Sequence, residues 1–344
     1  MDAQPLSFPW DTPPEPGEAV EVAPGILWFR LPLPMALDHV NLYALDEGDG
    51  WTLIDSGMNW AKARAQMEQV LAGPMGGKPV RRVVLTHHHP DHIGLAGWFA
   101  EQGAEIVATR VAWLTARMLQ LDEQERPVEA QKLFWRRAGM APEIYEKRCN
   151  ERPFNFADMT VPLPLGFTRI AEGDAITMGG RRWHVRLGQG HAPDHATFWC
   201  EDAPLVLGGD QLLPSISPNL GVYPTEPEAD PVGEWLESCA RLAAHARGDQ
   251  LVLPGHKLPF TGLPARLVQM ADNHHTALAR LLKHLSATPG SAHDCFEPIF
   301  GRQITGGAYG LALVEAVGHL NHLYVTGKVS REVGPDDAYI FRVN

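Results

Sequence analysis

Four short apolar runs in this sequence are each followed at once by a loop that carries histidine or aspartate. The first run, 81–85 (RRVVL), leads into 86–92 (THHHPDH), which has the pattern HxHxDH. Three later runs lead into 190–195 (GHAPDH), 208–210 (GGD) and 254–256 (PGH). Ligand sites of layered α/β proteins collect just beyond the ends of such strands. The chain is therefore expected to fold so that these four strand ends meet at one place.

The residue types in these loops are those that bind transition metals. In an extended segment alternate side chains face the same way, so His87 and His89 can point at one ion. Asp91 and His92 lie where the chain turns into a helix and can reach a second ion. Imidazole suits zinc, iron and related metals, and carboxylate neutralises their charge. The alternatives for this loop alone are a solvated histidine-rich segment and ordinary helix capping by Pro-Asp-His. The candidate metal ligands of the whole chain are His87, His89, Asp91, His92, His191, Asp210 and His256.

The order of the expected elements indicates two packed sheets with helices outside, an αββα layering of the α/β class. Expected strands alternate with helices up to about residue 110, and strands return from residue 167. Between them lies a helical insert over about 111–160, which we interpret as a cap. After residue 262 the chain is mainly helical. Gly327 is placed to end a helix over 311–324, and a hairpin over 328–343 follows it, which resembles a small winged-helix unit.

These patterns predict three parts of the chain. Residues 1–18 are Pro-rich and acidic and are expected to form a flexible lead-in. Residues 19–262 are expected to form the catalytic domain, and residues 263–344 a smaller helical, winged-helix-like domain. The expected helices 61–71, 93–102 and 231–247 fall within the catalytic domain.

Composition narrows the classes of partner and compartment. The 344 residues include 41 acidic and 29 basic side chains, which gives a formal net charge of -12. Such a charge disfavours nucleic acid as the main partner. The four cysteines are far apart and form no CxxC pair, so neither a disulfide framework nor a thiolate zinc site is expected. We find no secretory signal and no stretch as long as a membrane span, so a cytoplasmic location is expected, with no membrane partner.

The motifs THHHPDH, GHAPDH, GGD and PGH, in this order over residues 20–260, resemble those of the metallo-β-lactamase superfamily. The resemblance implies an αββα sandwich that holds two divalent ions, with zinc expected and iron or manganese as alternatives. It implies one ion on His87, His89 and His191. It implies a second ion on Asp91, His92 and His256, with Asp210 as the bridge. Asp91 and Asp210 are the carboxylates for which a catalytic role is expected. Asp55, in Ile54-Asp55-Ser56-Gly57, and His195 are expected to support the ligands from behind.

Within that superfamily the chain resembles the glyoxalase II-like and LACTB2-like branches that carry a C-terminal domain. The function expected first is hydrolysis of a thioester or related ester-like bond of a small molecule, by a hydroxide shared between the two ions. The alternatives are an RNA nuclease of the LACTB2-like type and a lactonase or β-lactamase-like hydrolase. A mono-iron dioxygenase or a non-catalytic binding protein is a further alternative. The apolar C-terminal helix is expected to be able to form a homodimer contact.

The remaining histidines are expected to be structural for the most part. His88 and His184 are expected at the surface or in packing, and His39 as a plain strand residue. His274 and His275 lie in an expected C-terminal helix, where a role at the edge of the substrate site is the alternative. In the insert, Trp135-Arg136-Arg137 is a candidate contact for an anionic group such as a CoA phosphate.

Overall fold

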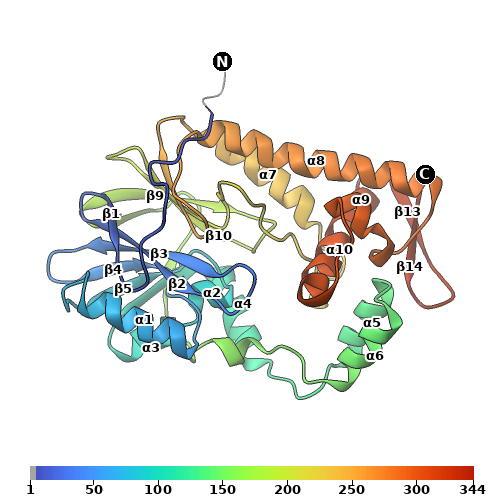
Figure 1. Ribbon diagram of the computed structural model, residues 1–344, viewed down its shortest axis with the longest axis horizontal. Helices are drawn as coiled ribbons and strands as arrows, with labels where there is room; N and C mark the ends of the chain where they lie inside the picture. Colours follow the sequence, from blue (N-terminus) through green and yellow to red (C-terminus); the bar gives the residue numbers. More distant parts are fainter. Residues whose placement is uncertain (1–4) are drawn as a thin grey trace.

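The structure is a computed structural model that describes residues 5–344. Its first sheet has seven strands, arranged side by side in chain order; β1 to β5 are labelled in Figure 1. Neighbours from β1 to β4 run antiparallel, and neighbours from β4 to β7 run parallel. The strands are β1 (Val20–Ala23), β2 (Ile26–Pro32), β3 (His39–Asp46), β4 (Trp51–Ile54), β5 (Val80–Val84), β6 (Glu105–Thr109) and β7 (Thr168–Ile170).

The second sheet has five strands in the order β12-β11-β10-β9-β8. Its strands are antiparallel except for β11 and β12, which are parallel neighbours. They are β8 (Ala175–Met178), β9 (Arg181–Gly188), β10 (His195–Cys200), β11 (Leu205–Gly209) and β12 (Leu251–Pro254). The apolar runs that precede the histidine and aspartate loops are therefore β5, β9, β11 and β12, as the sequence predicts.

The two sheets face each other across a buried apolar core, with helices on both outer faces. Trp28 of β2 packs in one cluster with Trp183 and Phe198 of the second sheet. Phe29, the next residue of β2, faces the opposite side and packs in the cluster that includes α1 and α3. On the far side of the second sheet, Val206 shares a cluster with residues of α7 and α8. The predicted α/β class and αββα layering are confirmed.

The helices of the catalytic region surround these sheets. They are α1 (Ala61–Ala72), α2 (Pro90–Ile93), α3 (Ala96–Glu101), α4 (Arg110–Leu121), α5 (Glu129–Arg137), α6 (Pro142–Asn150), η1 (Phe156–Met159) and α7 (Pro231–Ala243). The single helix expected over 93–102 is two helices, α2 and α3. Gly94 lies between them, and a Cβ there would be 2.6 Å from Asn59 N and from Gly57 O. The chain at residues 57–59 thus passes too close for a continuous helix with side chains.

The insert divides between the two ends of the molecule rather than forming one cap. α4 packs in the first domain, where Trp113 and Ala116 join the cluster beneath α1 and α3. α5 packs instead with the C-terminal helices, because Phe134 and Trp135 share a cluster with residues of α8 to α10. In Figure 1, α5 and α6 lie beside the C-terminal hairpin and α4 lies beside α2. The loop from 122 to 128 spans the distance between them.

The C-terminal region consists of helices followed by a hairpin, as predicted. Its elements are α8 (Leu263–Ala287), η2 (His293–Cys295), α9 (Phe296–Phe300), η3 (Gly306–Ala308), α10 (Tyr309–Val325), β13 (Val329–Val333) and β14 (Tyr339–Val343). Gly327 ends α10 at a φ of 69°, and its N–H donates to the carbonyl of Tyr324. One core cluster joins β11, β12, α7 and these helices, so packing is continuous across the predicted boundary at residue 262.

The flexible lead-in predicted over 1–18 differs from the structure in residues 5–18, while residues 1–4 lie outside the described residues. Ser7 and Thr261 exchange two backbone hydrogen bonds of 3.3 and 2.9 Å. The ring of Trp10 meets that of Trp28 edge to face at 6.2 Å. Burial of the indole surface offsets the entropy that this segment loses on docking.

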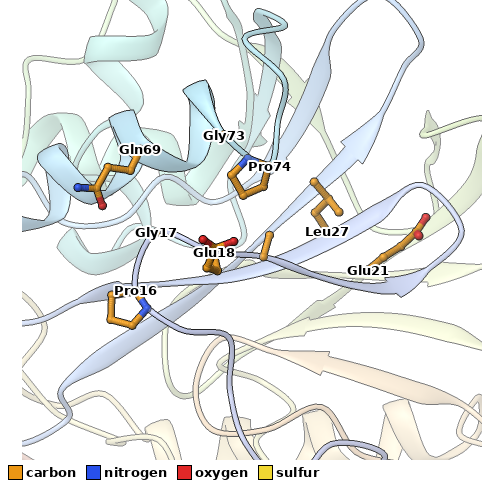
Figure 2. A pocket seen from close by; sticks show the side chains of 9 residues that line it. Pro16, Gly17, Glu18, Glu21, Leu27, Gln69, Gly73 and Pro74 are labelled. Atoms are coloured by element: carbon orange, nitrogen blue, oxygen red, sulfur yellow. The ribbon is translucent and has the colours of Figure 1, made fainter.

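One cavity lies away from the histidine loops. It has a volume of about 650 Å³ and opens between the β1–β2 hairpin and the C-terminal end of α1 (Figure 2). Its wall is formed by Pro16, Gly17, Glu18, Ala19, Glu21, Leu27, Gln69, Gly73 and Pro74. None of the candidate ligands contributes to it. Among the helices of residues 5–344, none combines the length and the apolar character needed to cross a bilayer.

Candidate metal centre

The four loops come from strands of both sheets. The carboxyl end of β5 carries residues 86–92, and the carboxyl ends of β11 and β12 carry Asp210 and His256. The loop between β9 and β10 supplies His191. The sheets meet at this edge, where Ala196 N donates to the carbonyl of Thr86 at 2.8 Å. All seven candidate ligands consequently lie around one centre.

One group of three ring nitrogens lies on His87, His89 and His191. His89 Nδ1 is 2.9 Å from His87 Nε2 and 3.0 Å from His191 Nε2. The three ligand atoms lie within 4.8 Å of one another. Zinc bonds of 2.0–2.1 Å in a tetrahedron place ligand nitrogens about 3.3 Å apart, close to these separations. These three side chains therefore form a face that a single ion can fill.

A second group consists of Asp91, His92 and His256. Asp91 Oδ2 is 3.5 Å from His92 Nε2 and 3.4 Å from His256 Nε2. Their ligand atoms also lie within 4.8 Å of one another. This group has the mixed imidazole and carboxylate character that divalent ions accept.

Asp210 lies between the two groups. Its Oδ2 is 3.5 Å from His191 Nε2 and 3.1 Å from His256 Nε2, while its Oδ1 is 3.4 Å from His92 Nε2. One carboxylate thus reaches nitrogens that belong to each group. This is the position that a bridging ligand requires.

The histidine rings are held from behind by groups that fix which nitrogen carries the proton. Asp55 Oδ2 accepts from His92 Nδ1 at 2.8 Å, and Asp55 also accepts from the hydroxyl of Thr86. That hydroxyl lies 2.9 Å from His87 Nδ1 and, because its own proton goes to Asp55, it accepts from His87. These bonds hold one proton on Nδ1 of His87 and of His92, so Nε2 of each ring faces the centre and is the atom available to a metal.

Backbone carbonyls do the same for the two remaining Nε2 ligands. His191 Nδ1 donates to Asn219 O at 2.9 Å, and His256 Nδ1 donates to His39 O at 2.7 Å. Asp55 itself is a non-glycine residue at a φ of 63°, a conformation held by its contacts with Thr86 and His92. In His191 and His256, as in His87 and His92, Nδ1 therefore carries a proton and Nε2 faces the centre, as metal binding through Nε2 requires.

The negative charge of the carboxylates at the centre favours the binding of cations. Asp55 and Asp210 are buried and Asp91 is half-buried beside them, and among residues 5–344 no lysine or arginine forms an ion pair with any of the three. Burial alone would lower the pKa of His256, but Asp210 and Asp91 outweigh it and raise that pKa to about 9. Burial would likewise lower the pKa of His92, yet Asp210, Asp91 and Asp55 raise it well above the usual range. Without metal, protons therefore supply the positive charge that the carboxylates demand.

These observations show that the residues fit a pair of divalent ions. His92 Nε2 and Asp210 Oδ1 are buried and have no hydrogen-bond partner among the described residues. Buried polar atoms without partners are costly, and a bound cation would satisfy both. The donor set contains nitrogen and oxygen but no thiolate, which suits zinc, iron or manganese.

His195 supports Asp210 and not an ion directly. Its Nε2 accepts from Asp210 N at 3.0 Å, and its ring stacks on His87 at 4.6 Å. The approach needs glycine at 209, because a Cβ there would lie 2.5 Å from His195 Cε1. The GGD motif thus brings the imidazole against the backbone of the bridging residue.

Several residues behind the ligands were not singled out from the sequence. Thr86 and Asn219 were missed, and His39 was expected to be a plain strand residue. Thr86 could have been found, since a hydroxyl directly precedes the first ligand. Asn219 and His39 act through backbone carbonyls, and because every residue has one, this role cannot be recognised from residue type. His39 Nε2 also accepts from Lys257 N at 3.0 Å, which fixes the residue after His256.

The other histidines and the insert arginines lie elsewhere. His88 is buried beside the centre, where burial lowers its pKa to about 3, and His184 pairs with Glu201. His275 is exposed, whereas His274 lines a cavity of about 260 Å³ between α8, α9 and α10. Arg136 and Arg137 both form ion pairs with Asp337 of the C-terminal hairpin. The guanidinium groups predicted as a contact for an anionic ligand are therefore paired with a carboxylate of the chain itself.

Comparisons with known proteins agree with this geometry. The family profile described as metallo-beta-lactamase superfamily matches residues 35–256, and the profile of a metallo-beta-lactamase-like C-terminal domain matches residues 278–344. The chain is 28% identical over 306 residues to a probable metallo-hydrolase, YqjP, of Bacillus subtilis (strain 168). That match covers 87% of this chain and 92% of the relative.

Two solved structures are similar along almost the whole chain. One is a beta-lactamase domain protein from Burkholderia ambifaria, with a TM-score of 0.88 and 34% identity; the match covers 98% of this chain and 97% of that one. The other is a metallo-beta-lactamase family protein from Thermus thermophilus, with a TM-score of 0.79 and 29% identity. It covers 94% of this chain and 100% of that one.

Proposed function

Because the chain belongs to the metallo-beta-lactamase superfamily, we propose that it is a hydrolase that uses two divalent ions to cleave a thioester or related ester of a small molecule. The observation that carries the proposal is the position of Asp210 between two groups of three ligands. His87, His89 and His191 would hold one ion, and Asp91, His92 and His256 the other. We propose zinc, with iron or manganese as alternatives that accept the same ligands.

The residues of the chain divide the work at this centre. Bound divalent ions supply Lewis acidity, which polarises a carbonyl oxygen and lowers the pKa of water. Asp210 lies between the two ligand groups and would link them, and Asp91, which belongs to the second group, is the other carboxylate at the centre that could accept a proton. Asp55 and Thr86 hold a proton on Nδ1 of His92 and His87, which leaves Nε2 of each ring as the atom that would bind a metal. No serine or cysteine nucleophile is required.

An apolar strip on α4, a helix whose N-terminus lies against the loop of His191, supports an acyl substrate. Thr109 caps α4, and its hydroxyl donates to Asp194 O in the loop that carries His191. Along α4, Leu114, Met118 and Leu121 have exposed fractions of 58%, 47% and 72%. From residue 110 to residue 121 the helix extends about 17 Å, which is enough to contact a medium-length acyl chain. Large exposed apolar side chains on one helix face are typical of a binding surface.

The net charge of the chain and its C-terminal domain help to choose between the thioester substrate and the alternatives of RNA, a lactone or a β-lactam. The net charge of -12 supports a small-molecule substrate over RNA. The matched C-terminal domain supports the proposal that the chain lies near the glyoxalase II-like or LACTB2-like branches. A lactonase or β-lactamase-like activity uses the same centre and is an outcome of the test.

The test combines metal analysis with a substrate panel. The purified protein is expected to hold close to two ions per chain and to hydrolyse acyl thioesters in preference to a lactone, a β-lactam and single-stranded RNA. His87→Ala and Asp210→Ala are expected to lower kcat/KM at least 100-fold, since each removes a group whose loss costs several kcal/mol. His275→Ala, an exposed histidine on α8, is the matched control and is expected to retain full activity.

Two results would contradict the proposal. A wild-type protein that binds no divalent ion would remove the metal centre. Full turnover by His87→Ala would show that the activity belongs to another site or to a contaminant. Within an active enzyme, a rise of kcat/KM from acetyl to decanoyl thioester that is lost in Leu114→Ser/Met118→Ser would support the role of the α4 strip, with Leu165→Ser as the exposed control.

A further inference from the structure

The segment between β11 and α7 connects the candidate metal centre to α10. Its residue Asn219 contributes the carbonyl oxygen that accepts from His191 Nδ1 at 2.9 Å. His191 is the ligand that the β9–β10 loop presents to the first group. The position of one backbone carbonyl therefore sets both the proton and the tilt of this imidazole.

The side chain of Asn219 is fixed by α10. Its Nδ2 donates to Glu315 Oε2 at 2.8 Å and to Leu311 O at 3.1 Å. Both partners are acceptors, so the amide nitrogen must point toward α10. Two hydrogen bonds thus join the C-terminal region to a candidate ligand: Asn219 donates to Glu315, and His191 donates to Asn219.

Further bonds hold the rest of this segment to the same helix. Val222 N donates to Val314 O at 3.1 Å. Nδ2 of Asn321 donates to the carbonyls of residues 227 and 229 at 3.0 and 2.9 Å. His322 Nδ1 is within hydrogen-bond distance of Asp230 Oδ2, at 3.0 Å. The segment from 219 to 230 is consequently attached to α10 along most of that helix.

We propose that α10 is a positioning element for the metal centre, in which Glu315 and Asn219 hold the carbonyl that orients His191. This inference rests on the proposed metal-binding role of His191. It gives the C-terminal region a role in the chemistry without placing any of its residues in contact with substrate. Groups that orient a metal ligand typically change metal affinity 10- to 100-fold when they are removed.

The surroundings of Glu315 favour this role over a purely structural one. Glu315 lines the cavity of about 260 Å³ together with His274 and His319. Burial raises the pKa of Glu315 to about 7, because desolvation disfavours the charged carboxylate at this position. Its one direct side-chain hydrogen bond within residues 5–344 is the bond to Asn219. The carboxyl group therefore has one partner, and that partner leads to His191.

The experiment measures metal affinity rather than activity. Zinc is titrated into the metal-free full-length protein in competition with a chromogenic chelator, and the absorption spectrum of the cobalt-loaded protein reports the ligand geometry. Glu315→Ala and Asn219→Ala are expected to weaken binding of one ion by about 10-fold and to change the cobalt spectrum. Glu315→Gln is expected to stay close to wild type, because its amide oxygen still accepts from Asn219 Nδ2.

A matched control separates positioning from general destabilisation. Glu297→Ala removes an exposed glutamate of α9 that does not contact the 219–230 segment. Wild-type zinc affinity and an unchanged cobalt spectrum in both Glu315→Ala and Asn219→Ala would overturn the inference. An equal loss in Glu297→Ala would also overturn it, since the effect would then be one of stability. A wild-type protein that binds no zinc would instead refute the proposed function.

Discussion

Replacement of Asp55 by asparagine tests how the centre prepares its ligands. The carboxylate accepts three hydrogen bonds, from Thr86 N at 2.8 Å, from the Thr86 hydroxyl at 2.8 Å and from His92 Nδ1 at 2.8 Å. Asparagine has the same shape but offers one acceptor oxygen and one donor nitrogen. If its oxygen keeps the bond to Thr86 N, its amide nitrogen faces two donors.

The expected consequence is a change of proton position on His92. The ring can accept from the new amide only by moving its proton from Nδ1 to Nε2, the nitrogen that faces Asp91 and Asp210. A protonated Nε2 has no lone pair for a metal. Loss of such a supporting carboxylate costs 10- to 100-fold in metal affinity, or about 1.4–2.8 kcal/mol. Asparagine tolerates the left-handed φ of 63° as well as aspartate does, so backbone strain does not confound the result.

The assay is the same chelator competition, with each ion resolved in turn. Asp55→Asn is expected to weaken the ion on Asp91, His92 and His256 more than the ion on His87, His89 and His191. Asp46→Asn, at the end of β3 and paired with Lys78 at the surface, is the control and is expected to bind like wild type. Wild-type affinity for both ions in Asp55→Asn would refute the argument that this carboxylate sets the tautomer of His92.

Three further outcomes are expected. Gly209→Ala places a Cβ 2.5 Å from His195 at a φ of 48°, and it is expected to lower the free energy of unfolding in urea by about 1–3 kcal/mol. Gly166→Ala, whose Cβ would have nothing within 4 Å, is the control and is expected to change this free energy little. Equal effects of the two substitutions would contradict the close approach at Gly209. Zinc at 100 times its Kd is expected to raise the free energy of unfolding of the chelator-treated protein by about 2.7 kcal/mol. A Tm that does not change when zinc is added would contradict a site that forms only in the folded state. The pKa of Glu315 is raised to about 7 by burial, so its protonated form is favoured in the folded chain. Its contribution to stability is therefore fully present below about pH 4.5 and is lost as pH rises toward 7, and this part of the decline in Tm is expected to be absent in Glu315→Gln.

The features that the sequence predicted well are those encoded by neighbouring residues. The hairpin of β13 and β14 follows from the turn signal Gly334-Pro335-Asp336-Asp337 between the segments 328–333 and 338–343, and the structure pairs Val333 with Tyr339 across it. β5, β11 and β12 are short and apolar, and the loop chemistry begins where each ends. β11 and β12 are parallel, so their carboxyl ends share one edge, and the αββα arrangement brings the carboxyl end of β5 from the other sheet to the same place.

The features that the sequence did not predict depend on contacts between distant segments. The break between α2 and α3 is caused by residues 57–59 passing against Gly94, about 35 positions away in the chain. The insert has helical spacing throughout, and nothing in that spacing indicates that α4 packs with the first sheet while α5 packs with α8 to α10. Amphipathic patterns show which face of a helix is buried but do not identify what buries it.

The same distinction separates the ligands from the groups that orient them. A ligand must be a histidine or a carboxylate, so the seven candidates can be recognised by residue type. The groups behind His191 and His256 are backbone carbonyls of Asn219 and His39, and every residue has a carbonyl. Which imidazole nitrogen faces the ions is decided by those carbonyls, and the position of the first depends on a glutamate 96 residues away. Metal affinity in this chain is therefore expected to respond to substitutions in α10 that no ligand motif would single out, and this is why Glu315 is a sharper test of the centre than another histidine would be.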